Sequence, residues 1–203
     1  MLLDNKKKKR RAIYKKIARL HKLSINQGFL STLGEPFLAL LYEAIDSDPN
    51  SILLTEEING KILGFLAGGK NMKYVYLQML RQSPRLITAL LPEIIKPKKL
   101  IGMLELVWFL FKKKTNVETK MPELFSIAVL HSERSKGIAK RLYKSFSRGL
   151  SQNGESAFCI LVGDNLDSAH QFYLKMGAVP IRRIYVHKGS SSTMYKQNLS
   201  IFN

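Results

Sequence analysis

Residue types suited to binding an anion gather at residues 131–142, HSERSKGIAKRL. Gly137 lies there among serine and charged residues, directly after the apolar run ELFSIAVL and before an amphipathic segment. The N-terminus of a helix exposes unpaired backbone N–H groups and a partial positive charge, so phosphate groups bind at such ends, and glycine allows close approach. Arg134 and Lys136 add two cations. These residues predict a phosphate cradle, and an ordinary turn is the alternative interpretation.

A phosphate cradle requires a strand before the glycine and a helix after it, and the hydrophobic pattern supplies both. We expect a strand at 123–130 and a helix at 137–150, where apolar residues recur every fourth position from Ile138 to Leu150. A further strand, a helix and two final strands are expected near residues 157–163, 166–176, 180–187 and 193–199. This alternation predicts an α/β fold whose sheet is partly parallel.

The N-terminal half is expected to contribute two helices and a hairpin. Apolar residues at helical spacing predict a basic helix at 6–25, most regular from residue 12, and a second helix at 35–45. Two apolar strands flank Asn59 and Gly60, a pair that tolerates positive φ and favours a tight hairpin turn. Together these elements predict a layer of helices beside an antiparallel pair of strands.

Length and composition predict a single domain of residues 1–203, because 45% of the residues are hydrophobic and can form a core. The stretch 71–120 is apolar, helical in period and rich in lysine, and we expect it to be a helical insertion. Its longest near-continuous apolar run, 100–111, is far shorter than the roughly 20 residues that span a bilayer. We therefore expect a soluble or membrane-peripheral protein of the cytoplasm.

The cysteine count and the net charge narrow the range of compartments, metals and partners expected for the chain. The single cysteine, Cys159, cannot form an internal disulfide, which favours a reducing compartment and a buried, structural role. No His and Cys cluster has metal-ligand spacing, so we predict no metal. The net charge of +18 favours anionic partners such as nucleotides, acidic lipids or nucleic acid.

Two common phosphate-binding motifs, GxxxxGK[ST] and GxGxxG, are absent. The chain has instead Arg134-x-x-Gly137-x-Ala139, followed by NLDSAHQFYLKMGAVP from Asn165. In this order and spacing the two motifs resemble those of the GNAT acetyltransferase superfamily, whose members use acetyl-coenzyme A. The resemblance is clear over residues 121–178 and extends to the hairpin and the first helices. It fails over the insertion, and basic residues stand where the family has a strand before its first helix.

The resemblance implies a GNAT fold, in which helices flank a central mixed, mostly antiparallel sheet. The loop before the helix would wrap the coenzyme pyrophosphate, mainly through backbone N–H groups. Asn165, which its position at a helix start makes a candidate N-cap, would lie near the pantetheine arm. The backbone N–H of Val129 or Leu130 would hold the thioester oxygen as charge develops. The residues implied to contact acetyl-coenzyme A are Ile127, Ala128, Val129, Arg134, Ser135, Lys136, Gly137, Ile138, Ala139 and Asn165.

Two catalytic residues are also implied. Tyr173 would protonate the departing thiolate, and a packed aromatic side chain is its alternative role. The attacking amine must be neutral, and a carboxylate is the usual base. The resemblance places Glu123 in that role. The alternative bases are Glu118, His131 and Glu35.

The predicted activity is transfer of acetyl from acetyl-coenzyme A to a primary amine by direct attack. The block GFLSTLGEPFLALLYEAI, residues 28–45, resembles bacterial members associated with surface-polysaccharide pathways. This favours an amino sugar or a nucleotide-linked amino sugar as a small-molecule acceptor, and the positive charge suits an anionic one. A protein N-terminus or lysine is the alternative acceptor. A non-catalytic basic module that binds membrane or nucleic acid is the alternative function.

The insertion suggests two further contacts. Its apolar run 100–111 is flanked by lysines, a pattern typical of weak docking on an anionic membrane. The lysines are Lys96, Lys98, Lys99 and Lys112 to Lys114. The alternative is packing on the domain, near the acceptor side of the pocket, or on a second subunit in a homodimer. No specific nucleic-acid partner is predicted, because no common RNA-binding signature is present.

Overall fold

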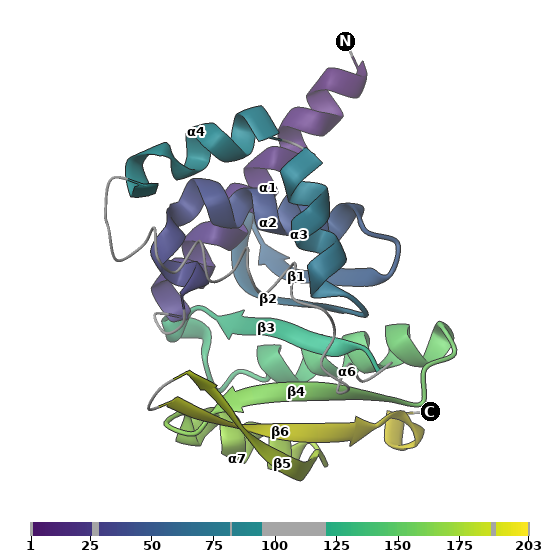
Figure 1. Ribbon diagram of the computed structural model, residues 1–203. Helices are drawn as coiled ribbons and strands as arrows, with labels where there is room; N and C mark the ends of the chain where they lie inside the picture. The colour runs from purple at the N-terminus through teal and green to yellow at the C-terminus, as the bar shows by residue number, and fades with distance from the viewer. Residues whose placement is uncertain (1, 26–28, 82, 95–120, 188–189, 203) are drawn as a thin grey trace.

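A computed structural model of the chain describes residues 2–25, 29–81, 83–94, 121–187 and 190–202. Its centre is one six-stranded sheet in the order β1-β2-β3-β4-β6-β5 (Figure 1). The strands are β1 Ser51–Ile58, β2 Lys61–Gly69, β3 Glu123–Val129, β4 Ala157–Gly163, β5 Val179–His187 and β6 Ser190–Asn198. β3 and β4 are parallel and every other neighbouring pair is antiparallel. The predicted mixed, mostly antiparallel sheet is confirmed.

Helices cover both faces of the sheet, because the strands direct apolar side chains into two cores. The helices are α1 Leu2–Ser24, α2 Gly34–Ser47, α3 Met72–Arg81, α4 Ser83–Ile94, α6 Ile138–Gln152 and α7 Asp167–Lys175. In β2, Ile62 and Phe65 pack with the helices of the N-terminal half, whereas Leu63 and Leu66 pack with α6. Hence α1 to α4 lie over one face and α6 over the other, with α7 beside the C-terminal strands (Figure 1).

The turn between β1 and β2 has the geometry that its residues predict. Asn59 and Gly60 have φ angles of 50° and 77°, in the left-handed region that glycine and asparagine adopt at the lowest cost. The chain therefore reverses directly, and Ile58 lies opposite Lys61 in antiparallel register. The predicted hairpin is confirmed.

The N-terminal elements differ in extent from the sequence expectations. α1 begins at Leu2 rather than at residue 6, because the leucine, lysine and arginine residues of this stretch are good helix formers. Within the described part of the chain, no strand precedes α1. The stretch 72–94 forms α3 and α4, and the rest of the expected insertion, 95–120, lies outside the described residues. None of the described helices is long and apolar enough to cross a membrane.

A buried chain of polar groups joins the end of α1 to β3. The His21 side chain, 6% exposed, lies between two hydroxyl groups. The Tyr42 hydroxyl donates to Nδ1 at 2.5 Å, and Nε2 donates to Ser31 Oγ at 3.0 Å. Ser31 donates in turn to the Ile25 carbonyl at 2.6 Å, and the Tyr42 oxygen lies 3.2 Å from Ser126 Oγ on β3. Because Ser31 gives its hydroxyl hydrogen to Ile25, it accepts from Nε2–H, and the neutral imidazole that burial favours then accepts from Tyr42 at Nδ1.

Acidification is expected to destabilise the fold through His21. Burial lowers the pKa of His21 from 6.5 to about 4, so the unfolded chain binds this proton at a higher pH than the folded chain. The stability conferred by neutral His21 is complete above pH 6.5 and is lost as the pH falls towards 4, at a cost of about 3 kcal/mol. Urea unfolding at the two pH values measures the loss. The variant His21→Gln lacks the titrating group and should lose less, so equal losses in both proteins would contradict this role.

Candidate active site

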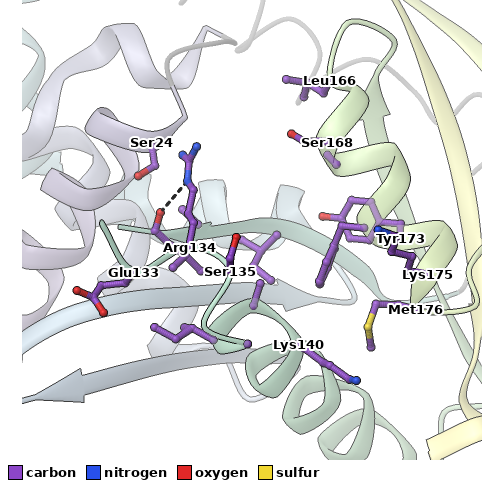
Figure 2. Close-up of a pocket in the computed structure, with 18 of the residues that line it drawn as sticks. Ser24, Glu133, Arg134, Ser135, Lys140, Leu166, Ser168, Tyr173, Lys175 and Met176 are labelled. Carbon is purple, nitrogen blue, oxygen red and sulfur yellow. Dashed lines mark hydrogen bonds between the residues drawn. The ribbon is translucent and has the colours of Figure 1, made fainter. Parts of the chain in front are cut away.

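β3 and β4 separate soon after they begin to pair. Their parallel ladder joins two residue pairs, Glu123 with Cys159 and Leu124 with Ile160, although both strands continue beyond them. A pocket of about 710 Å³ opens where the strands diverge, between β3, the loop that follows it, the first turn of α6 and the inner face of α7 (Figure 2). The pocket therefore lies at the one parallel junction of the sheet.

The pocket brings together most of the residues that the sequence predicts for a coenzyme site. Those that line it are Ile127, Ala128, Val129, Arg134, Ser135, Gly137, Ile138, Ala139 and Tyr173. Lys136, Asn165 and Glu123 are not among the lining residues. Backbone from β3, the following loop and α6 thus meets a side chain of α7 around one space.

The loop before α6 presents backbone N–H groups at the pocket. Ser135 and Gly137 have φ angles of 62° and 78°, and this turn allows α6 to begin at Ile138. Arg141 donates its N–H to the Gly137 carbonyl, and no side chain caps the helix. The N–H groups of residues 138–140 precede that bond and have no acceptor within the helix. These donors converge with the helix dipole beside a residue that has no side chain, so the loop fits a phosphate or pyrophosphate group.

The two cations predicted beside Gly137 are placed differently. Arg134 lines the pocket, and its Nε–H donates to the Val129 carbonyl at 3.5 Å (Figure 2). Lys136 pairs instead with Glu133, with 2.9 Å between Nζ and Oε2. The hydrogen bond from Lys136 lowers the pKa of the Glu133 carboxyl group. Arg134 is thus the cation of this loop that lies at the pocket, while Lys136 neutralises an acidic group at its rim.

The register between β2 and β3 decides which backbone groups of β3 face the pocket. Leu130 donates its N–H to the Leu63 carbonyl of β2 at 2.8 Å. Bonded and non-bonded pairs alternate along an antiparallel ladder, so Val129, opposite Gly64, turns its N–H and carbonyl away from β2. Ile127, two residues earlier, has the same orientation. Of the two N–H groups considered for an oxyanion site, that of Leu130 is therefore engaged by β2, and that of Val129 points into the gap.

Tyr173 extends from α7 with its hydroxyl group directed into the pocket (Figure 2). The side chain is 5% exposed and packs against the rings of Tyr143, Phe172 and Tyr195. The described residues provide no hydrogen-bond partner for its hydroxyl group. Burial raises the pKa of Tyr173 above its ordinary value. The phenol therefore stays protonated and can donate to a ligand atom.

Asn165 lies in the turn between β4 and α7 and does not cap the helix. The N-cap residue is Leu166, α7 begins at Asp167, and no side chain bonds to its first turn. The Leu166 N–H donates to the Gly163 carbonyl at 3.0 Å, and this turn delays the start of the helix. The predicted N-cap role of Asn165 is wrong for that reason.

The candidate bases lie outside the lining of the pocket. Glu123 begins β3, and burial raises its pKa. Burial, and after it the charge of Glu123, raises the pKa of Tyr76 on α3. His131 is exposed in a short 3-10 helix after β3, and Glu35 lies in the first turn of α2. Glu118 lies outside the described residues.

The pocket also has walls that the sequence did not predict. Ser24 and Ile25, at the end of α1, line one side, and Lys140 and Lys175 line another. Lys140 could have been predicted to line the pocket, because it lies one helical turn after Gly137. The contribution of α1 depends on how it packs across the sheet, and no local pattern shows this. The described residues contain no group of three or more His, Cys, Asp or Glu side chains suited to a metal ion.

A sequence model of one protein family matches the region that forms this pocket. The family is described as the acetyltransferase (GNAT) family, and the match covers residues 74–178, just over half of the chain. It includes β3, the loop before α6, and Tyr173. No curated protein sequence matches the chain significantly.

Solved structures of acetyltransferases share the fold. An N-acetyltransferase from Staphylococcus aureus Mu50 has a TM-score of 0.60 at 13% identity, over 93% of this chain and 94% of that chain. An aminoglycoside 6′-N-acetyltransferase complexed with coenzyme A has a TM-score of 0.58 at 12% identity, over 93% and 91%. The ribosomal-protein-S18-alanine N-acetyltransferase from Escherichia coli has a TM-score of 0.55 at 10% identity, over 92% and 87%. At these identities the likeness is one of fold.

Proposed function

Because this chain belongs to the acetyltransferase (GNAT) family and is an acetyl-coenzyme A-dependent N-acetyltransferase, we propose that acetyl passes directly to a primary amine in the pocket between β3 and β4. The observation that carries this proposal is the convergence of three kinds of group on one space. They are the backbone donors that follow Arg134, the N–H of Val129 and the hydroxyl group of Tyr173.

The proposed binding mode uses backbone groups more than side chains. The loop 134–139 holds the pyrophosphate, since its N–H groups and the N-terminus of α6 face the pocket. The free edge of β3, from Ile127 to Val129, pairs with the extended pantetheine arm, and Asn165 lies near the same arm. The Val129 N–H donates to the carbonyl oxygen of the thioester as negative charge develops there.

The proposed reaction moves two protons. The amine nitrogen bonds to the carbonyl carbon while the carbon–sulfur bond breaks, so one proton must leave the nitrogen and one must reach the sulfur. Tyr173 supplies the second, because burial keeps its phenol protonated inside the pocket. Glu123 accepts the first, directly or through water. The alternative bases are His131, Glu35 and Glu118.

The proposed acceptor is an amino sugar, free or linked to a nucleotide. The likeness of residues 28–45 to members from surface-polysaccharide pathways supports it, as does the net charge of +18, which suits an anionic acceptor. The shared fold with an aminoglycoside 6′-N-acetyltransferase is consistent with an amine on a sugar. The shared fold with a ribosomal-protein-S18-alanine N-acetyltransferase keeps a protein N-terminus as the second candidate.

Two measurements test the proposed function in sequence. Acetyl-coenzyme A should raise the thermal midpoint of the protein, because a ligand that binds only the folded state stabilises it. Thiol release should then appear with amino sugars or nucleotide-linked amino sugars and not with N-terminal peptides of ribosomal proteins. Thiol release with peptides alone would mean that the acceptor is a protein N-terminus. Neither a thermal shift nor thiol release would favour the non-catalytic module.

Glu123→Gln is expected to lower turnover roughly 100-fold, with a marked dependence on pH. Burial raises the pKa of Glu123, so the carboxylate can act as a base only above that raised value. As the pH rises towards the pKa of the acceptor amine, a larger fraction of the amine is already neutral and needs no base. The effect of the variant should therefore be largest just above the raised pKa and shrink as the pH rises. Turnover rates measured across pH for Glu123→Gln, Glu35→Gln and His131→Gln identify the general base. A wild-type pH profile for Glu123→Gln would mean that Glu123 is not the base.

A further inference from the structure

The helix that carries Tyr173 is short and has no side-chain cap. α7 spans nine residues, Asp167–Lys175, and no described side chain bonds to its first turn. Isolated helices of this length are marginal in water, so tertiary contacts must hold α7 in place. The Tyr173 hydroxyl group has no hydrogen-bond partner among the described residues. Its place in the pocket therefore depends on where α7 lies and on how the phenol ring is packed.

His170, near the middle of α7, joins the helix to two strands of the sheet. Its Nε2 lies 3.1 Å from the carbonyl oxygen of Gly163, the last residue of β4. Its Nδ1 lies 2.7 Å from the hydroxyl oxygen of Tyr195 on β6. A carbonyl oxygen only accepts, so Nε2 carries a proton, and in the neutral ring Nδ1 accepts from the Tyr195 hydroxyl group. One imidazole ring thus fixes α7 to β4 and to β6.

The contacts of His170 lead to Tyr173. Tyr173 follows His170 by three residues, so the two side chains lie on the same side of α7. The buried ring of Tyr195 has its centroid 5.7 Å from that of His170 and 6.3 Å from that of Tyr173. The rings of Tyr143 and Phe172 also pack on Tyr173. Tyr195 therefore packs against the proton donor and accepts or donates the hydrogen bond that holds its helix.

We propose that His170 is a positioning residue for acetyl transfer, because its hydrogen bonds to Gly163 and Tyr195 keep α7 where the Tyr173 hydroxyl group points into the pocket (Figure 2). The inference rests on the proposed function, since it requires Tyr173 to be the proton donor. Displacement of a reacting group by about 1 Å can cost roughly 100-fold in rate. His170 is not among the residues that line the pocket, so it acts through α7 rather than on the substrate.

The inference is tested by combining variants of three residues. His170→Leu removes both hydrogen bonds and should lower turnover about tenfold with coenzyme affinity unchanged, as measured by thiol release and calorimetry. The same change in a Tyr173→Phe protein should lower turnover no further, because His170 acts through the hydroxyl group that this protein lacks. Tyr195→Phe should also lower turnover, and His170→Leu with Tyr195→Phe should lose no more than His170→Leu alone.

Hydrogen exchange of the coenzyme-free protein reports on α7 independently of activity. The backbone amides of α7 should exchange faster in His170→Leu and in Tyr195→Phe than in wild type, because each variant removes a contact that holds the helix. The amides of α1 should exchange at the wild-type rate. Unchanged exchange of α7 in both variants would mean that these hydrogen bonds do not fix the helix, and would overturn the inference.

Tyr14→Phe is the matched control for Tyr195→Phe. Tyr14 is 6% exposed and Tyr195 is 4% exposed. The Tyr14 hydroxyl group donates to Asp46 at 2.6 Å, between α1 and α2 and outside the lining of the pocket. Each variant removes one phenol hydroxyl group and its hydrogen bond, so each should lower the thermal midpoint, but only Tyr195→Phe should lower turnover. Equal losses of turnover in the two variants would mean general destabilisation and would overturn the inference.

The outcome for wild type separates this inference from the proposed function. If wild type is active and a folded His170→Leu protein keeps full turnover, or loses as much in Tyr173→Phe as it does alone, the positioning role is wrong and the proposed function is unaffected. A wild-type protein that releases no thiol with any amine would contradict the proposed function and this inference together.

Discussion

Gly137→Glu is expected to weaken acetyl-coenzyme A binding at least about 100-fold while the protein remains folded. A pyrophosphate held at the start of α6 approaches the backbone at a residue with no side chain. Glutamate would place both bulk and a negative charge in that space, and two unit charges about 4 Å apart at a protein surface repel by a few kcal/mol. Isothermal titration calorimetry with acetyl-coenzyme A measures the loss.

The fold should tolerate this change because its local costs are small. Gly137 has a φ of +78°, and a Cβ there would lie 3.3 Å from Arg141 Nη1, at the end of a flexible side chain. The left-handed backbone costs a residue other than glycine about 1–2 kcal/mol. Gly154 offers a matched control, because its φ is +81° and a Cβ there would meet no atom within 4 Å. Gly154→Glu carries the same strain and charge at the far end of α6, so it should retain full coenzyme affinity.

An unchanged affinity in a folded Gly137→Glu protein would mean that the loop does not hold the pyrophosphate. An equal loss of affinity in Gly154→Glu would mean that net charge, rather than the loop, determines binding. Either result would contradict the proposed site without bearing on the membership of the family.

Tyr173→Phe is expected to lower turnover about 100-fold with little change in coenzyme affinity. The variant removes only the proton donor, and general acid catalysis typically contributes 100-fold or more. The hydroxyl group has no hydrogen-bond partner among the described residues, so its loss should leave stability nearly unchanged. Steady-state rates of thiol release and a coenzyme titration measure the two effects separately.

Tyr143 provides the control for this pair of effects. Its ring lies 6.0 Å from that of Tyr173, but its hydroxyl group donates to Gln197 Oε1 at 2.8 Å within the core. Tyr143→Phe should therefore lose about 1 kcal/mol of stability and keep its turnover. If Tyr173→Phe kept wild-type turnover, Tyr173 would be a packed aromatic residue and the thiolate would receive its proton from elsewhere.

Local sequence patterns predicted the parts of the site that are built locally. The loop at Gly137, the helix that follows and the strand before it all depend on neighbouring residues, so one short stretch indicates them. The hairpin at Asn59 and Gly60 was predictable for the same reason. A helix start is less certain, because a turn that forms just before it, as at Asn165, moves it by one or two residues.

Features that depend on pairing between distant segments could not be predicted. The choice between Val129 and Leu130 as backbone donors follows from the register of β3 on β2, which no pattern within β3 reveals. Lys136, which was expected at the phosphate, is a local exception, because its side chain pairs with Glu133 three residues earlier. Ser24 reaches the pocket only because α1 packs across the sheet.

The short ladder between β3 and β4 has a consequence for cooperativity. Two residue pairs join the two halves of the sheet, and α6 is the helix that spans both, since Leu142 and Phe146 share a core with Leu66 of β2 and with Phe158 of β4. A substrate that pairs with the edge of β3 and is held at the start of α6 would tie the same two halves together. The two halves of the coenzyme-bound enzyme would then unfold together, whereas in the free enzyme they would be joined only weakly between β3 and β4. The supply of coenzyme would in this way determine how cooperatively the protein unfolds as well as its rate of reaction.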